Sequence, residues 1–146
     1  MAHSRVRSRG GHLVAVGVKI EGLEEVIEQL TGVLPREAKN LARSAVHSIA
    51  SQMRDEIRRE APVDTGTLRK SIFSYRRRGT ATQVVSEVRA RKSGFYWRFI
   101  EFGTVNQPAR PFVNPTVERM RGLIVGIFRN QLGKRLEKLM AKKAKR

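Results

Sequence analysis

The clearest pattern in the chain is a long run of apolar residues spaced three and four apart, which begins at Pro35. This spacing predicts an amphipathic helix of about seven turns, and proline is favoured in a first helical turn. The helix should end at Ala61, because the residue before Pro62 is disfavoured in helical geometry. The apolar positions are Ala38, Leu41, Ala42, Ala45, Ile49, Met53 and Ile57.

A second long helix is predicted near the end of the chain, where apolar residues follow helical spacing from Val117 to Leu139. Gly122, Gly126 and Gly133 interrupt this pattern and should weaken the helix. Residues 22–31 predict a shorter helix, with its acidic residues near the N-terminus, where the helix dipole favours them.

Alternating apolar and polar residues predict three strands, at 13–20, 68–75 and 84–91. The last two should form a hairpin with Arg76–Thr80 at its tip. The order of elements predicts the α+β class, in which a small antiparallel sheet with a basic hairpin packs on the long helix. We expect a basic arm at 1–11, a single domain at 12–132 and a basic tail at 133–146.

Five of the nine aromatic residues lie close together in the segment that follows the hairpin. Phe95, Phe99 and Phe102 have helical spacing, which favours a buried or interface cluster. Bases beside them leave open a stacking platform for single-stranded nucleic acid. An extended link should follow, held by Pro108, Pro111 and Pro115, with Phe112 between the last two. The five aromatics are Phe95, Tyr96, Trp97, Phe99 and Phe102.

The chain is strongly basic: it has 30 Lys and Arg residues and 13 Asp and Glu residues, which give a net charge of +17. The excess falls in three zones, +3 in the arm, +7 at residues 69–92 and +7 at residues 129–146. Clusters of this kind indicate contact with a polyanion or an acidic partner, or else basic ends that are merely solvated. We expect such contacts at Arg76, Arg77, Arg78, Lys142, Lys143, Lys145 and Arg146.

Candidate chemistry is sparse. The chain has no cysteine, its three histidines are scattered, and no apolar run approaches the length of a membrane-spanning helix. Asp64-Thr65-Gly66 is the triplet that aspartic proteases use, but here it follows an amphipathic helix, which favours a turn. The sequence therefore predicts no enzyme, no metal, no cofactor and no membrane contact.

Several motifs occur together in one order. The helix signal that opens at Gly22-Leu23 is followed by the long helix, and then by the segment Ala61-Pro62-Val63-Asp64-Thr65-Gly66-Thr67-Leu68-Arg69-Lys70-Ser71. Tyr96, Phe99 and Glu101-Phe102-Gly103-Thr104 come next, and Pro108-Ala109-Arg110-Pro111-Phe112-Val113-Asn114-Pro115 closes the series. Over residues 20–130 the chain resembles the tail-completion, or head-tail joining, family of long-tailed bacteriophages, the gene-product-ten-like family of lambdoid siphophages.

The resemblance implies a structural protein of the virion neck, made in the host cytoplasm. It would form a ring, a hexamer in this interpretation, that joins the head connector to the tail and surrounds double-stranded DNA. The marked residues would be structural: Asp64, Thr65 and Gly66 set a turn, Glu101, Phe102, Gly103 and Thr104 close the aromatic segment, and Pro111, Phe112 and Pro115 anchor the last helix.

Other functions remain open at this point. Within the neck, the roles of tail terminator and head stopper remain open, because small neck proteins share size and charge. From a different class, a free nucleic-acid-binding protein would use the same basic arm, hairpin and tail.

Overall fold

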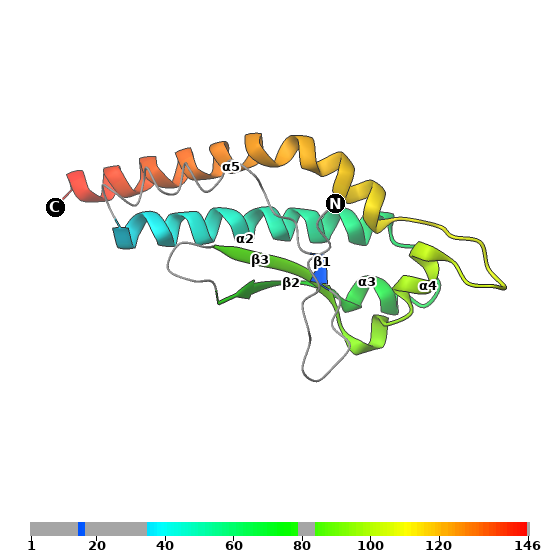
Figure 1. The fold of residues 1–146 in the computed structure, drawn as a ribbon. Helices are drawn as coiled ribbons and strands as arrows, with labels where there is room; N and C mark the ends of the chain where they lie inside the picture. Colours follow the sequence, from blue (N-terminus) through cyan, green and yellow to red (C-terminus); the bar gives the residue numbers. More distant parts are fainter. Residues whose placement is uncertain (1–14, 17–34, 79–83, 146) are drawn as a thin grey trace.

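The computed structural model describes residues 15–16, 35–78 and 84–145, which form three layers (Figure 1). The helix α2 (Pro35–Glu60) is the middle layer and confirms the long helix predicted from the apolar spacing. The sheet covers one side of α2, and α5 (Val113–Ala144) covers another. The helix predicted at 22–31 lies outside the described residues.

The sheet is antiparallel, with β3 (Val85–Ala90) between β1 (Ala15–Val16) and β2 (Ile72–Arg77). Its register pairs Ile72 with Ala90 and Arg77 with Val85. This sheet beneath long helices confirms the α+β class. Of the first predicted strand, the described part is β1.

Two predictions about the hairpin are wrong. Residues 68–71 belong to the one-turn helix α3 (Thr67–Ser71), in which Leu68 and Ser71 are both buried and the Ser71 hydroxyl donates to the Leu68 carbonyl at 2.7 Å. In addition, Arg76 and Arg77 are not at a tip, because cross-strand pairing continues through both of them.

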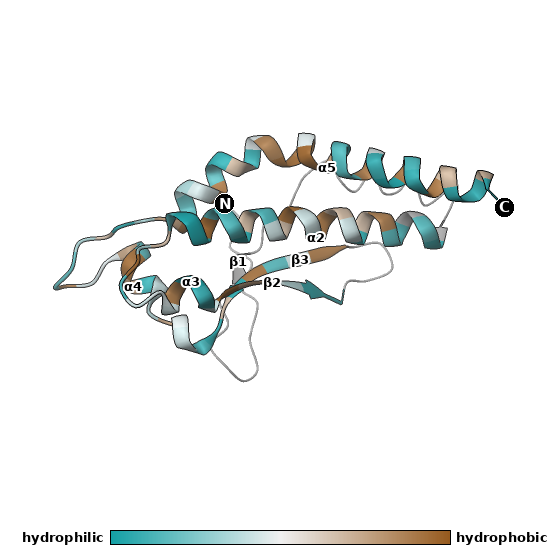
Figure 2. Cartoon of the chain, turned by 180° about the vertical axis from the view of Figure 1, so that it is seen from behind, coloured by the Kyte–Doolittle hydropathy of each residue, from teal (hydrophilic) through white to brown (hydrophobic). Residues whose placement is uncertain are grey.

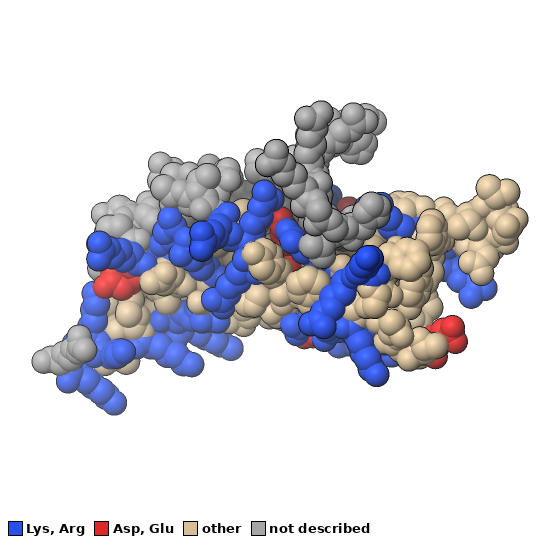
Figure 3. Space-filling model, turned by 90° about the horizontal axis from the view of Figure 1, so that it is seen from below, with Lys and Arg blue, Asp and Glu red and all other residues tan. Residues whose placement is uncertain are grey.

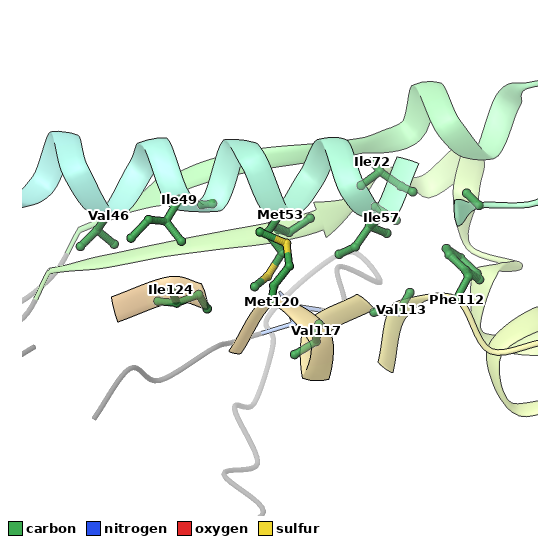
Figure 4. Packing of buried hydrophobic residues seen from close by; sticks show 14 of the residues in the cluster. Val46, Ile49, Met53, Ile57, Ile72, Phe112, Val113, Val117, Met120 and Ile124 are labelled. Atoms are coloured by element: carbon green, nitrogen blue, oxygen red, sulfur yellow. The ribbon is translucent and has the colours of Figure 1, made fainter. Parts of the chain in front are cut away.

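The core lies on both sides of α2, which packs against β2, β3 and α5. Figure 4 shows Val46, Ile49, Met53 and Ile57 of α2 beside Val113, Val117, Met120 and Ile124 of α5. Small residues of α2 are fully buried: Ala45 is 0% exposed and Ala42 is 1% exposed. Alanine permits close approach of a neighbouring element because its side chain is a single methyl group.

The chain between the sheet and α5 forms the 3₁₀ turn η1 (Lys92–Gly94), the helix α4 (Trp97–Phe102) and a loop at residues 103–112 that projects from one end of the molecule (Figure 1). The extended link was predicted to reach Pro115, but α5 begins at Val113 and contains this proline in its first turn. A proline fits there because those N–H groups have no partner within the helix. Phe112 is buried.

The aromatic cluster differs from its expected burial. Trp97 is 8% exposed and belongs to the core, whereas Phe95, Phe99 and Phe102 are 58%, 50% and 66% exposed. Phe99 and Phe102 lie on the exposed side of α4, and Phe95 lies just before this helix. The prediction that these three residues lie in the core is wrong. The alternative, that they form an interface, remains a prediction.

The C-terminal half of α5 is strongly hydrophilic, as Figure 2 shows by colour. The helix continues without a break to Ala144, so residues 133–144 are helical. Packing of α5 against the core persists through Leu132, which is buried, and Leu136, which is half-buried. None of the helices in the described part of the chain contains an apolar stretch that could span a lipid bilayer.

Candidate assembly surfaces

The turn between α2 and α3 contains the triplet Asp64-Thr65-Gly66. Gly66 has a φ of 76°, a left-handed conformation that favours glycine. The side chain that bonds locally is Thr65, whose hydroxyl accepts from the Thr67 backbone at 3.4 Å, whereas Asp64 is exposed. Arg69 donates to the carbonyls of Arg59 and Ala61 at 3.1 Å each, which satisfies backbone acceptors where α2 ends.

Glu101 joins α4 to the start of α5. Its carboxylate accepts hydrogen bonds from the backbone N–H groups of Phe112, Val113 and Asn114 at 2.7, 2.8 and 2.7 Å. Glu101 is 3% exposed. These donors lie in the first turn of α5, where the helix leaves them unpaired and its dipole favours a negative charge. The carboxylate therefore caps the last helix from a distant part of the chain.

The projecting loop begins at Gly103 and is closed at its base by backbone hydrogen bonds. Gly103 has a φ of 75°, and a Cβ at this position would lie 2.8 Å from the backbone nitrogen of Ala109. Thr104 and Gln107 form an isolated antiparallel bridge, and the Arg110 N–H donates to the Ile100 carbonyl at 2.7 Å. A residue with a side chain would therefore both strain the backbone and collide with it at Gly103.

The buried carboxylate of Glu87 forms ion pairs with two arginines of the sheet. Glu87 is 4% exposed and pairs with Arg77 at 3.1 Å across the hairpin. Arg89 on the same strand also donates to it, through Nε at 2.7 Å. The Arg89 guanidinium in turn lies 4.8 Å from the centre of the Tyr75 ring, within the range of a cation–π contact. Both arginines therefore have ordered positions on the hairpin.

Basic residues of α2, β2 and α5 lie over the half of the molecule in which α5 finishes. Lys143 of α5 lies 3.9 Å from Glu37 of α2, which places the last turns of α5 beside the first turn of α2. Figure 3 shows Lys and Arg over much of this end. We define the basic end as Arg36, Lys39, Arg43, Arg76, Arg77, Arg78, Lys138, Lys142, Lys143 and Lys145.

Two titratable groups of α2 have pKa values below their ordinary values. Burial, and then the positive charges of Arg76 and Arg54, lower the pKa of His47 below its ordinary value of 6.5. A hydrogen bond from Arg54 lowers the pKa of Asp55. His47 therefore favours the neutral form, as expected beside a concentration of positive charge. Among the described residues, no three His, Asp or Glu side chains are placed to hold a metal ion.

The structure brings together some predicted residues and separates others. Glu101, Phe102, Gly103, Pro111, Phe112 and Pro115 occupy one junction between α4 and α5, while Asp64, Thr65 and Gly66 form the turn closed by Arg69. Sequence reasoning missed Arg69 as the residue that closes this turn, and it missed the Glu87 pairs. The sequence alone does not show that Arg77 pairs with Glu87, because this pair depends on the cross-strand register of the hairpin. Arg146 lies outside the described residues.

The fold and these junctions define a small α+β protein. Residues 24–103, more than half of the chain, match the family model described as "Bacteriophage HK97-gp10, putative tail-component". The chain therefore belongs to the HK97-gp10-like family of bacteriophage tail components, and such a component is part of the virion beside other virion proteins. No curated protein and no solved structure matches the chain.

Proposed function

We propose that this protein is a non-enzymatic component of the phage neck that completes the tail by joining it to the head connector. In this proposal, copies of the chain form a ring, a hexamer, around the channel through which double-stranded DNA passes. Membership of the tail-component family supports the general role. The observation that carries the finer role is the basic end, which holds lysines and arginines of α2, β2 and α5 in one half of the molecule.

Electrostatics supports a polyanion or an acidic neighbour at the basic end. The described acids at this end are Glu37, which is paired with Lys143, the buried Glu87, which is paired with Arg77, and Glu137. Six copies at +17 each would repel one another strongly, so a ring needs negative charge from DNA phosphates or acidic partner surfaces. The motif residues have structural roles in this proposal: they fix the α2–α3 turn and the α4–α5 junction.

Charge-removing variants in the phage test the proposal. Replacing Arg76, Arg78 and Lys142 with serine should impair neck assembly and DNA retention, because the basic end loses three exposed charges while the pair between Arg77 and Glu87 is kept. A matched control replaces Arg59, Lys70 and Arg121 with serine, which removes the same charge elsewhere. Equal neck assembly and DNA retention in both variants would contradict the role of the basic end. Electron microscopy of purified particles, with this chain located, tests the place in the neck.

Two alternatives give different results in these experiments. A tail terminator or a head stopper would occupy another ring of the neck in the same micrographs. A free nucleic-acid-binding protein would bind duplex DNA as an isolated monomer, with affinity falling steeply as salt rises. The basic end favours this second alternative too, so DNA binding by the monomer is the measurement that separates it from a role that begins only with assembly.

A further inference from the structure

An apolar surface on and around α4 is exposed to solvent. We define it as the aromatic face, which consists of Phe95, Phe99, Phe102 and Val105, at 58%, 50%, 66% and 104% exposed. Phe95 and Phe99 meet edge to face, with ring centroids 6.3 Å apart. Single exposed apolar residues are ordinary, but a group of this kind is typical of a protein contact site.

The backbone beneath the aromatic face is held by buried contacts. Between Phe99 and Phe102, the buried carboxylate of Glu101 accepts hydrogen bonds from the start of α5. Trp97 of the same helix packs in the core, and its ring lies 6.4 Å from the Phe102 ring. The exposed rings therefore stand on an ordered base, so that a partner loses little binding free energy to ordering them.

The aromatic face and the last turns of α5 lie at opposite ends of the molecule. Glu101 places α4 beside the first turn of α5, whereas Lys143 of the basic end belongs to the last turns of that helix. The helix has 32 residues, so its two ends are about 48 Å apart. Figure 1 shows α4 and the C-terminus at opposite ends. One copy can therefore contact two different neighbours at once.

The exposed charges of the chain that carries the aromatic face are all positive. Residues 91–117 contain one acid, Glu101, which is buried and bonded to backbone N–H groups. The turn before α3 adds one exposed acid, Asp64, so basic groups still prevail at this end. Such a surface attracts a partner that brings its own carboxylates. The exposed bases of this stretch are Arg91, Lys92, Arg98 and Arg110.

A second copy of this chain does not supply those carboxylates. The chain has a net charge of +17, and most exposed acids of its described part are already paired with bases of the same copy. Glu60 lies 3.4 Å from Arg119, and Glu118 lies 3.3 Å from Arg121. Contact with another copy would therefore bring more bases than free carboxylates towards the aromatic face.

Single-stranded nucleic acid also fits this surface poorly. Successive bases stack on aromatic rings whose faces are open. Here the ring of Phe95 is perpendicular to the rings of both Tyr96 and Phe99, at 90° to each. Ring edges therefore lie against ring faces that bases would need, and Val105, the most exposed member of the aromatic face, has no ring.

We propose that the aromatic face binds a different protein of the virion, at an apolar hollow edged by aspartate or glutamate. The phenylalanine rings and Val105 fill the hollow, and Arg98 and Arg110 pair with the carboxylates at its edge. Aromatic residues and arginine are the types enriched in protein interfaces. The inference rests on the proposed role of joining two neighbours, and it gives the chemistry of the neighbour at this end.

Photo-cross-linking in assembled particles identifies the occupant. Val105 is fully exposed, so replacing it with the photoreactive amino acid benzoylphenylalanine should leave the fold unchanged. After irradiation, mass spectrometry should find it joined to a peptide of a different virion protein that contains apolar residues and Asp or Glu. The same amino acid at Asn130, an exposed position of α5, is the control and should not reach this peptide. Cross-links to a lysine-rich and arginine-rich peptide, or none at all, would overturn the proposal.

Matched substitutions test the contact itself. Phe99→Asp should lower the fraction of joined particles in micrographs about tenfold or more, because it places a charge within the apolar contact. Leu123→Asp is the control, since Leu123 is equally apolar, is 58% exposed and lies on α5 outside the aromatic face. Arg98→Glu should also impair joining, whereas Arg98→Lys, which keeps the charge, should not. Equal losses in the Phe99 and Leu123 variants would refute a local contact.

The remaining outcomes separate this inference from the function on which it rests. Loss of rings by isolated Phe99→Asp in light scattering would identify a second copy as the occupant, which would overturn the inference and leave the neck function intact. Cross-links from position 105 to DNA would overturn it in the same way. Micrographs that place this chain away from the neck would overturn the neck function, while a cross-link to an acidic and apolar peptide in those particles would still support the partner chemistry.

Discussion

Replacing Glu101 with alanine tests the inference that one buried carboxylate holds the last helix in place. The change removes both oxygens that accept from the N–H groups of Phe112, Val113 and Asn114, at 2.7–2.8 Å. Because Glu101 is only 3% exposed, these bonds lie in a site shielded from water. The variant therefore leaves unpaired donors at the start of α5.

The expected loss of stability is large. Hydrogen bonds to a charged group each contribute about 1.5–3 kcal/mol, and the three share one acceptor group, so their contributions do not simply add. We expect Glu101→Ala to lower the free energy of unfolding by about 3–5 kcal/mol, out of a typical total of about 5–15 kcal/mol. The melting temperature should fall by about 10 °C.

The fluorescence of Trp97 provides the assay. It is the single tryptophan of the chain and is buried, and its ring lies 6.4 Å from that of Phe102, next to Glu101. Urea unfolding followed by this signal gives the free energy of unfolding. Glu118→Ala is the control, because its exposed pair with Arg121 should contribute about 0–1 kcal/mol. A loss below about 1 kcal/mol in Glu101→Ala would refute the inferred capping role.

Three further predictions concern other parts of the fold. Gly103→Ala should cost about 2–3 kcal/mol and Gly66→Ala about 1 kcal/mol, since both have positive φ but only the first would place a Cβ 2.8 Å from Ala109; equal costs in urea unfolding would contradict this. Because the pKa of His47 is lowered from 6.5, the unfolded state binds its proton more readily, so stability should decline as pH falls below about 6.5. His47→Gln should reduce that decline in denaturation curves across pH, and an unchanged slope would count against it. Phe128→Ala should cost about 3–5 kcal/mol because the ring is 2% exposed, and calorimetry showing a much smaller loss would contradict its core position.

Strong periodicity explains which elements could be predicted from the sequence. The apolar spacing of α2 runs over many turns, so the structure confirms it from Pro35 onwards. The helix α3 has one turn, and residues 68–71 are too few for helical and strand patterns to be distinguished. The start of α5 was misplaced because its cap comes from Glu101, a residue that no local pattern connects with Val113.

Burial was harder to predict than secondary structure. Helical spacing places Phe95, Phe99 and Phe102 on one side of a helix, but it does not determine whether that side meets the core or the solvent. Here Trp97 faces the core instead. The same limit applies to Glu87, because its pairing with Arg77 depends on a cross-strand register that a single sequence does not specify.

The middle position of α2 has a consequence for how the sequence can vary. A helix packed on one side tolerates larger side chains on its other side, whereas α2 has neighbours on both. Ala42 and Ala45, at 1% and 0% exposed, therefore set the spacing between layers, and a larger residue at either site would push a layer outward. Across divergent members of the family, we expect these small residues to persist.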